Sequence, residues 1–151
     1  MPNFWLMKSE PSEVSIDDLA RAPRKTLPWT GVRNYQARNF MRDMQLGDGV
    51  FFYHSSCPEP GIAGLARIAG RLQPDATQFD PHSVYFDAKS TPDKPRWLQL
   101  DVTLERKTRL LSLAEMRSAP ELATMTVLRR GNRLSITPVS ATEWAAVQAL
   151  L

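Results

Sequence analysis

Alternation of apolar and polar residues marks the strands of this chain. Residues 98–105 alternate strictly between Leu or Val and a polar residue, which is typical of a strand with one buried face. Residues 4–8 and 50–54 predict two further strands, the second continuously apolar and suited to a buried position. Residues 62–72 predict a longer strand whose glycines indicate a bend or bulge. Residues 134–139 predict an edge strand, because their proline cannot donate within a central ladder.

Helices are predicted where a capping residue precedes an apolar repeat. Ser15–Asp18, Ser112–Glu115 and Ser140–Glu143 each have the spacing of a capping box, with Asp in the Glu position in the first of them. Pro120 can start another short turn, because proline suits the first helical position. One more helix is predicted after Asn34, a good N-cap residue, on the helical spacing of Ala37, Phe40, Met41 and Met44.

Two segments are predicted as loops. Residues 22–28 form a basic loop with two prolines, and residues 73–96 form a long ordered loop with one short strand near Tyr85. Strands and long helices do not alternate regularly, which disfavours a doubly wound parallel sheet. The prediction is therefore a single α+β domain over residues 1–151, a compact, partly open β-barrel of about five to six strands with short flanking helices.

The composition is that of an ordinary globular domain. The chain has 151 residues, of which 42% are hydrophobic, and this excludes wholesale disorder. No apolar run approaches the ~20 residues of a membrane helix, and the N-terminus lacks the basic region of a signal peptide. The single Cys57 cannot form an internal disulfide. These features predict a cytoplasmic protein without a membrane partner.

The positive charge is mild, and its distribution is more informative than its size. A net charge of +3 permits nucleic-acid binding without requiring it. The basic residues near the candidate site are arginines, which make planar and bidentate contacts that lysine cannot make. Solvated surface side chains remain an equal alternative for each of them. We interpret six as candidate contacts to a nucleic-acid backbone: Arg33, Arg38, Arg42, Arg129, Arg130 and Arg133.

The segment from Trp29 to Asn39 carries the strongest functional signal. It places two arginines, two asparagines, a tyrosine and a tryptophan at a predicted helix start. This combination suits a flat polar ligand held near a negative charge. Trp29 lies in a predicted loop, and Trp97 has the parity opposite to the apolar row of its strand, so both are candidate stacking surfaces. Core packing is the alternative for both.

Residues for catalysis or metal binding are sparse. His54 and Cys57 lie close in sequence, but the four ligands of a structural zinc site and the third group of a catalytic cysteine site are missing. The favoured explanation is that His54 ends a strand and that Cys57 is a loop or core residue. No P-loop, GxGxxG or HExxH motif is present. We predict no metal, no cofactor and no catalytic residue.

Several segments together resemble the EVE family, and they occur in order along nearly the whole chain. The matching segments are Trp5–Pro11, Ser15–Leu19, Trp29–Asn39, Gly47–Ser55, Pro95–Trp97 and Leu128–Ser135. The resemblance implies a PUA-like fold related to YTH domains, with a pocket for a modified nucleobase. One departure is that the chain lacks the long basic N-terminal extension of larger eukaryotic relatives. This leaves a nuclear location unsupported and favours a stand-alone bacterial domain.

The same resemblance implies where the pocket residues lie. Trp29 would form the aromatic wall, and Arg130 and Asn132 would lie nearby. The end of the first strand, the helix start and the next strand would supply the other lining residues: Lys8, Ser9 and Glu10; Val32, Arg33, Asn34 and Tyr35; Tyr53, His54 and Ser55. Trp97 is added as a second candidate aromatic surface.

The leading functional hypothesis is a non-catalytic reader of a modified base in DNA or RNA. In this hypothesis Trp29 stacks on the base, and Asn34, Ser9 or backbone amides bind its polar edge. An enzyme acting on nucleotides or RNA through His54, Lys8 or Glu10 is the first alternative. A sensor of a free base-like small molecule is the second. The sequence does not indicate the oligomeric state, and a monomer is the default expectation.

Overall fold

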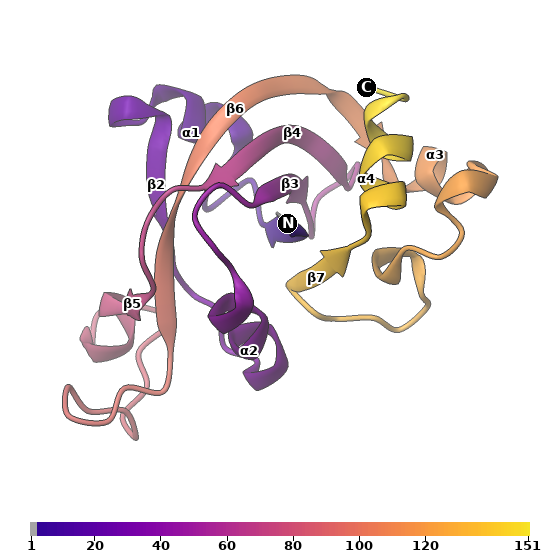
Figure 1. The fold of residues 1–151 in the computed structure, drawn as a ribbon. Coiled ribbons are helices and arrows are strands. Elements are labelled where there is room, and N and C mark those ends of the chain that lie inside the picture. The colour runs from indigo at the N-terminus through magenta and orange to yellow at the C-terminus, as the bar shows by residue number, and fades with distance from the viewer. Residues whose placement is uncertain (1–2) are drawn as a thin grey trace.

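One curved sheet organises the protein, and the computed structural model describes residues 3–151. The strand order is β2-β6-β4-β3-β1-β7, and the short β5 pairs with β6 outside this path. β1 and β3 are parallel, and the other pairs are antiparallel. The strands are β1 (Phe4–Ser9), β2 (Thr26–Trp29), β3 (Gly49–His54), β4 (Gly61–Ile68), β5 (Gln73–Pro74), β6 (Leu98–Ser112) and β7 (Ile136–Val139), and Figure 1 shows β6 arching over the others.

Four short α-helices accompany the sheet, and none within residues 3–151 has the length and hydropathy of a membrane-crossing segment. They are α1 (Ile16–Arg21), α2 (Tyr35–Asp43), α3 (Leu113–Ser118) and α4 (Ala141–Gln148). Single 3₁₀ turns lie at Pro23–Lys25, Ala76–Phe79, Pro120–Leu122 and Thr126–Leu128.

The predicted helix starts are confirmed with one exception. α1 and α4 begin with complete capping boxes, and the Asn34 side chain accepts a hydrogen bond from the Ala37 amide at 3.0 Å. Ser112 accepts from the Glu115 amide, but the Glu115 carboxylate does not accept from the Ser112 amide. The Glu115 carboxylate instead accepts from Arg109 at 3.1 Å, so only half of the predicted box forms.

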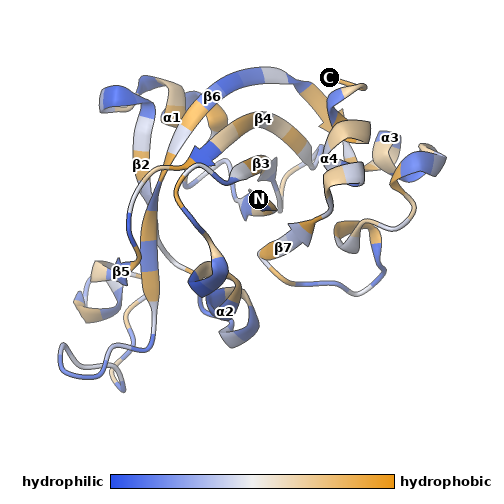
Figure 2. Cartoon of the chain, in the orientation of Figure 1, coloured by the Kyte–Doolittle hydropathy of each residue, from blue (hydrophilic) through white to orange (hydrophobic). Residues whose placement is uncertain are grey.

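Two hydrophobic clusters cover opposite faces of the sheet. On β3, Val50 and Phe52 belong to the cluster beneath α1 and α2, whereas Phe51 and Tyr53 belong to the cluster beneath α3 and α4. Central β4 is covered on both faces and is mostly hydrophobic, whereas hydrophobic and hydrophilic residues alternate along β6 (Figure 2). Trp144 of α4 packs in the second cluster. The predicted α+β class is confirmed, and the sheet stays open between its edge strands β2 and β7.

Three local predictions are wrong. Residues 22–28 contain a 3₁₀ turn and most of β2, so Trp29 ends a strand and does not lie in a loop. The short strand within residues 73–96 is Gln73–Pro74 and does not include Tyr85, and the strand predicted over residues 62–72 ends at Ile68. The sheet consequently has seven strands, more than the five to six predicted. β2 and β5 were missed because each is short and pairs only with β6, a partner distant in sequence.

Candidate functional site

A cavity of about 420 Å³ opens on the face of the sheet that carries α1. Its walls come from the end of β1, the connection to α1, the segment 27–32, the loop after β3, the long loop 75–97 and the turn before β7. Its volume lies within the range of ~300–1,000 Å³ that is typical of small-molecule sites. The cavity therefore combines segments from most of the chain.

Six of the predicted pocket residues line this cavity. They are Lys8, Ser9, Glu10, Trp29, Val32 and Ser55. Trp29 is only partly buried, and its ring meets Phe52 edge-on with centroids 5.4 Å apart. Arg133 also lines the cavity, although the sequence suggested it only as a backbone contact. Trp29 therefore lies on the wall of the cavity.

The Tyr53 and His54 side chains do not line the cavity, and the prediction for them is wrong. Neighbouring residues on a strand point to opposite faces, so both could not lie with Ser55 on one wall. Tyr53 is buried in the second core cluster, and burial raises the pKa of its hydroxyl. The Nε2 atom of His54 accepts a hydrogen bond from the Ile16 amide at 3.1 Å, at the start of α1.

We expect His54 to make stability depend on pH. Burial lowers the pKa of His54 below its ordinary value of 6.5, although Asp17 partly opposes this effect. The unfolded chain therefore takes up a proton at higher pH than the folded protein. The stability that comes from keeping His54 neutral in the folded protein is fully present above pH 6.5. It is lost as the pH falls toward the pKa of His54 in the folded protein. When the pH is lowered from 7.5 to 5.5, the free energy of unfolding measured with denaturant should fall less for His54→Gln than for wild type. An equal loss in both proteins would contradict this assignment.

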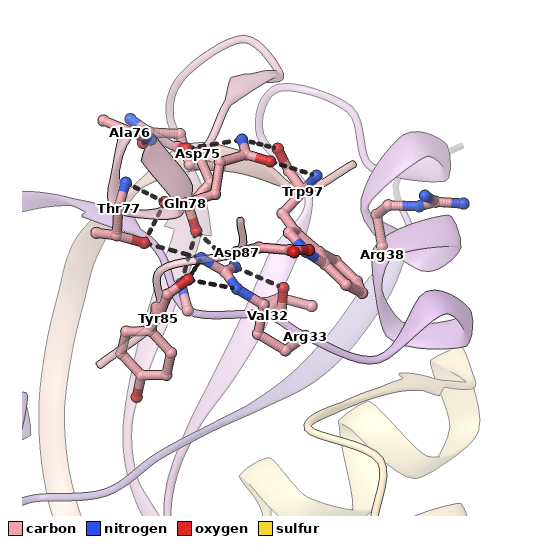
Figure 3. Close-up of polar contacts among 12 residues, drawn as sticks. Val32, Arg33, Arg38, Asp75, Ala76, Thr77, Gln78, Tyr85, Asp87 and Trp97 are labelled. Carbon is pink, nitrogen blue, oxygen red and sulfur yellow. Dashed lines mark hydrogen bonds and ion pairs between the residues drawn. The ribbon is translucent and has the colours of Figure 1, made fainter. Parts of the chain in front are cut away.

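Arg33 is an internal anchor and is not free to contact a phosphate. Its Nη1 atom lies 3.0 Å from a carboxylate oxygen of Asp75, whose side chain is completely buried. Its Nε and Nη2 atoms donate to the carbonyl oxygen of Tyr85 at 3.1 and 2.8 Å. Figure 3 shows the guanidinium enclosed by these partners and Thr77. The arginine therefore fixes the loop 75–97 against the segment before α2.

Trp97 is covered and offers no open stacking surface. Only 6% of the residue is exposed, and its Nε1 atom donates to Asp87 at 2.8 Å. The Tyr35 ring stacks on it with centroids 4.8 Å apart, and the Arg38 guanidinium lies 4.7 Å from the Tyr35 centroid. These three side chains form a stack outside the cavity. The strand parity of Trp97 was correct, but the long loop covers that face.

The remaining predicted residues lie outside the cavity lining. Asn34 caps α2, and Asn132 holds its own turn through bonds to the Thr126 carbonyl and the Leu134 amide. The arginines that remain exposed for other contacts are Arg42, Arg129 and Arg130. Both asparagines therefore have structural roles in this fold.

Among the cavity residues that sequence reasoning missed are two that contact each other, Glu13 and Tyr85. The Tyr85 hydroxyl donates to a carboxylate oxygen of Glu13 at 2.5 Å, although the residues are 72 positions apart. Burial raises the pKa of Tyr85 to about 12, and the bond to Glu13 adds to the shift. No local motif signals this pair, because both residues lie in irregular segments.

The sequence of this chain matches a known domain family over almost its whole length. The model of the EVE domain matches residues 3–150. The chain belongs to the EVE domain family. The predicted family is thus confirmed, and the matched range includes every wall of the cavity.

Relatives of this EVE domain extend the comparison. Thymocyte nuclear protein 1 of Homo sapiens is 42% identical over 167 residues, covering 99% of this chain and 74% of the relative. A crystal structure from Pseudomonas putida is 50% identical with a TM-score of 0.93, covering 97% and 98% of the two chains. The human THYN1 protein in complex with 5-methylcytosine containing DNA is 44% identical with a TM-score of 0.91, covering 98% and 96%.

A more distant neighbour shows the fold alone. The YTH domain of a Zygosaccharomyces rouxii protein superimposes with a TM-score of 0.56 at 12% identity, covering 99% of this chain and 86% of that chain. The predicted PUA-like fold is thereby confirmed for this EVE domain.

The predicted cytoplasmic location is wrong in the light of these names. The relatives that match almost the whole chain are called thymocyte nuclear proteins. The prediction rested on the missing targeting signals and basic extension, and the names of the nuclear relatives contradict it.

Within residues 3–151, no group of three or more His, Cys, Asp or Glu side chains is placed to hold a metal ion.

Proposed function

We propose that this EVE domain is a non-catalytic nucleic-acid-binding protein that holds one modified base in the cavity beside Trp29. The observation that carries the proposal is the partly exposed indole of Trp29 on the wall of a cavity of about 420 Å³ that Arg133 also lines. The DNA complex of the human relative supports the same ligand class. We make DNA the first ligand to test and RNA the second.

The proposed mechanism uses stacking, an apolar slot and a basic rim. A base that leaves its own stack would lie against Trp29, a contact worth roughly 1–3 kcal/mol. Leu27, Phe52 and Val102 line the same cavity and would receive an apolar modifying group. Arg133 at the cavity would hold a flanking phosphate, the role that the sequence gave to Arg33.

Two contacts favour binding over catalysis. The Nε2 atom of His54 is occupied by the Ile16 amide, and burial lowers its pKa and favours the neutral ring. The Lys8 ammonium lies 5.9 Å from the centroid of Tyr53, a residue of the opposite face. Both groups therefore have partners away from a bound base. Hydrolysis of RNA by the purified protein, abolished in Lys8→Ala or His54→Ala, would overturn the non-catalytic assignment.

The decisive experiment measures the affinity for short oligonucleotides that each carry one modified base. We expect wild type to prefer one modification, and Trp29→Ala to lose roughly 5- to 150-fold in affinity for it, since stacking on one ring is worth about 1–3 kcal/mol. Tyr35→Ala is the matched control, because Tyr35 is 50% exposed and lies outside the cavity. Equal binding by wild type and Trp29→Ala would contradict the proposal.

A salt titration separates this proposal from a sensor of a free base. Release of counterions makes the affinity for a polyanion fall steeply as salt increases. Affinity for an uncharged base should change little. If the affinity for the oligonucleotide did not change with salt, and the free base bound with the same affinity, the small-molecule sensor would be favoured.

A further inference from the structure

The cavity has a carboxylate that is held in place by a distant residue. Glu13 lies on the connection between β1 and α1, where its amide donates to the Glu10 carbonyl at 2.9 Å. The Ser9 hydroxyl donates to the Val14 carbonyl at 2.6 Å, which braces the same turn. The Glu13 side chain is then oriented by the hydroxyl of Tyr85. Both ends of this residue are therefore positioned.

Tyr85 can orient Glu13 because its own ring has little freedom to move. A Cβ atom added at Gly31 would lie 2.8 Å from the ring, so the ring packs directly on that backbone. The Arg33 guanidinium lies 5.4 Å from the ring centroid and binds the Tyr85 carbonyl oxygen. Asp75 in turn holds Arg33 and the Gly31 amide. Figure 3 shows Arg33 and Asp75 of this network beside Tyr85.

The pair presents an acceptor to the cavity. Burial raises the pKa of Tyr85 to about 12, so its hydroxyl keeps its proton and donates it to Glu13. That bond occupies Oε2 of Glu13 and leaves Oε1 able to accept. A carboxylate is the side-chain group that accepts from the exocyclic amino group of cytosine. A carbonyl oxygen in the same place would leave the acceptor without a donor.

We propose that Glu13, positioned by Tyr85, selects a base that carries an exocyclic amino group, such as cytosine or adenine, over one that carries a carbonyl there. The inference rests on the proposed function and names its base class. Glu13 is the residue that contacts the base, and Tyr85 is a positioning residue. Glu13 is exposed in the free protein, and a base in the cavity would cover its carboxylate. Sites that bind a substrate donor through a covered acceptor reject analogues that lack the donor.

The test compares 5-methylcytosine with thymine at one position of the same oligonucleotide. The two bases share the 5-methyl group and differ in the amino or carbonyl group at ring position 4 and in the adjacent ring nitrogen. We expect wild type to bind 5-methylcytosine roughly 10-fold more tightly than thymine, because one good base-edge pair gives about 1–3 kcal/mol of discrimination. Glu13→Gln should bring the ratio close to one, since an amide can also donate.

Three further variants separate this role from a general loss of structure. Tyr85→Phe keeps the ring on Gly31 but removes the donor, so it should lower the ratio and leave thymine affinity unchanged. Glu59→Gln and Glu121→Gln each remove an exposed glutamate outside the cavity lining. Neither control should change the ratio.

The outcomes are distinguishable from failure of the proposed function. A wild-type ratio near one, or an unchanged ratio in both Glu13→Gln and Tyr85→Phe, overturns this inference while Trp29-dependent binding stands. Equal binding of all oligonucleotides by wild type and Trp29→Ala defeats the proposed function itself. A lowered ratio in both variants, with both controls unchanged, supports the inference.

Discussion

Replacing Asp75 with alanine is expected to lower the free energy of unfolding by about 3–5 kcal/mol, because it removes one partner of a buried ion pair. The Asp75 side chain is completely buried, while that of Arg33 is 21% exposed. Its carboxylate also accepts from the Gly31 amide and from the amide and hydroxyl of Thr77. The substitution would leave these donors unpaired and a charge uncompensated. Equilibrium unfolding in urea measures the loss.

Glu105→Ala is the matched control for this substitution. Glu105 pairs with Arg67 at 2.7 Å, but the two side chains are 36% and 44% exposed. Exposed ion pairs contribute about 0–1 kcal/mol, so the control should unfold almost as wild type. If Asp75→Ala lowered the free energy of unfolding no more than Glu105→Ala does, the loop 75–97 would not depend on the pair of Asp75 and Arg33.

Replacing Gly31 with alanine is expected to destabilise the protein and to weaken base binding together. Gly31 has a φ of +83°, a left-handed conformation that costs other residues about 1–2 kcal/mol. The added methyl group would also overlap the ring of Tyr85, and overpacking typically costs another 1–3 kcal/mol, about the same again. Movement of that ring would release Glu13. Unfolding and oligonucleotide affinity should be measured on the same preparations.

Gly47→Ala separates the cost of the left-handed backbone from the cost of the overlap with the Tyr85 ring. Gly47 has a φ of +87° but no atom within 4 Å of the added methyl group, so it pays only the backbone cost. It also lies outside the cavity lining, so base affinity should stay unchanged. The double variant Gly31→Ala/Tyr85→Ala removes the overlap and should recover part of the stability of Gly31→Ala. Equal stability of Gly31→Ala and Gly47→Ala would show that the ring yields without cost.

Local patterns along the chain were sufficient for most elements of the fold. Alternation located β6 at residues 98–105, and capping residues located α1, α2 and α4. These signals work because a strand face or a helix cap depends on neighbours within a few residues. The same patterns could not find β2 or β5, because each pairs only with β6.

The arginines show the limit of such reasoning for the site. Arg33 and Arg133 both lie in irregular segments, and the sequence assigned both to phosphates. Arg33 instead pairs with buried Asp75, 42 residues away, whereas Arg133 lines the cavity. Sequence composition measures neither burial nor distance, and these two quantities decide whether a guanidinium is an anchor or a contact.

By itself, the sequence determined the α+β class, the family, the helix caps and the presence of Trp29 at the site. Only the tertiary structure decided that the loop 75–97 covers Trp97, encloses Arg33 and brings Tyr85 to Glu13. The physical reason is the range of the interactions. Backbone periodicity and capping act between near neighbours, whereas the polar contacts that hold the loop 75–97 join side chains 42 to 72 residues apart.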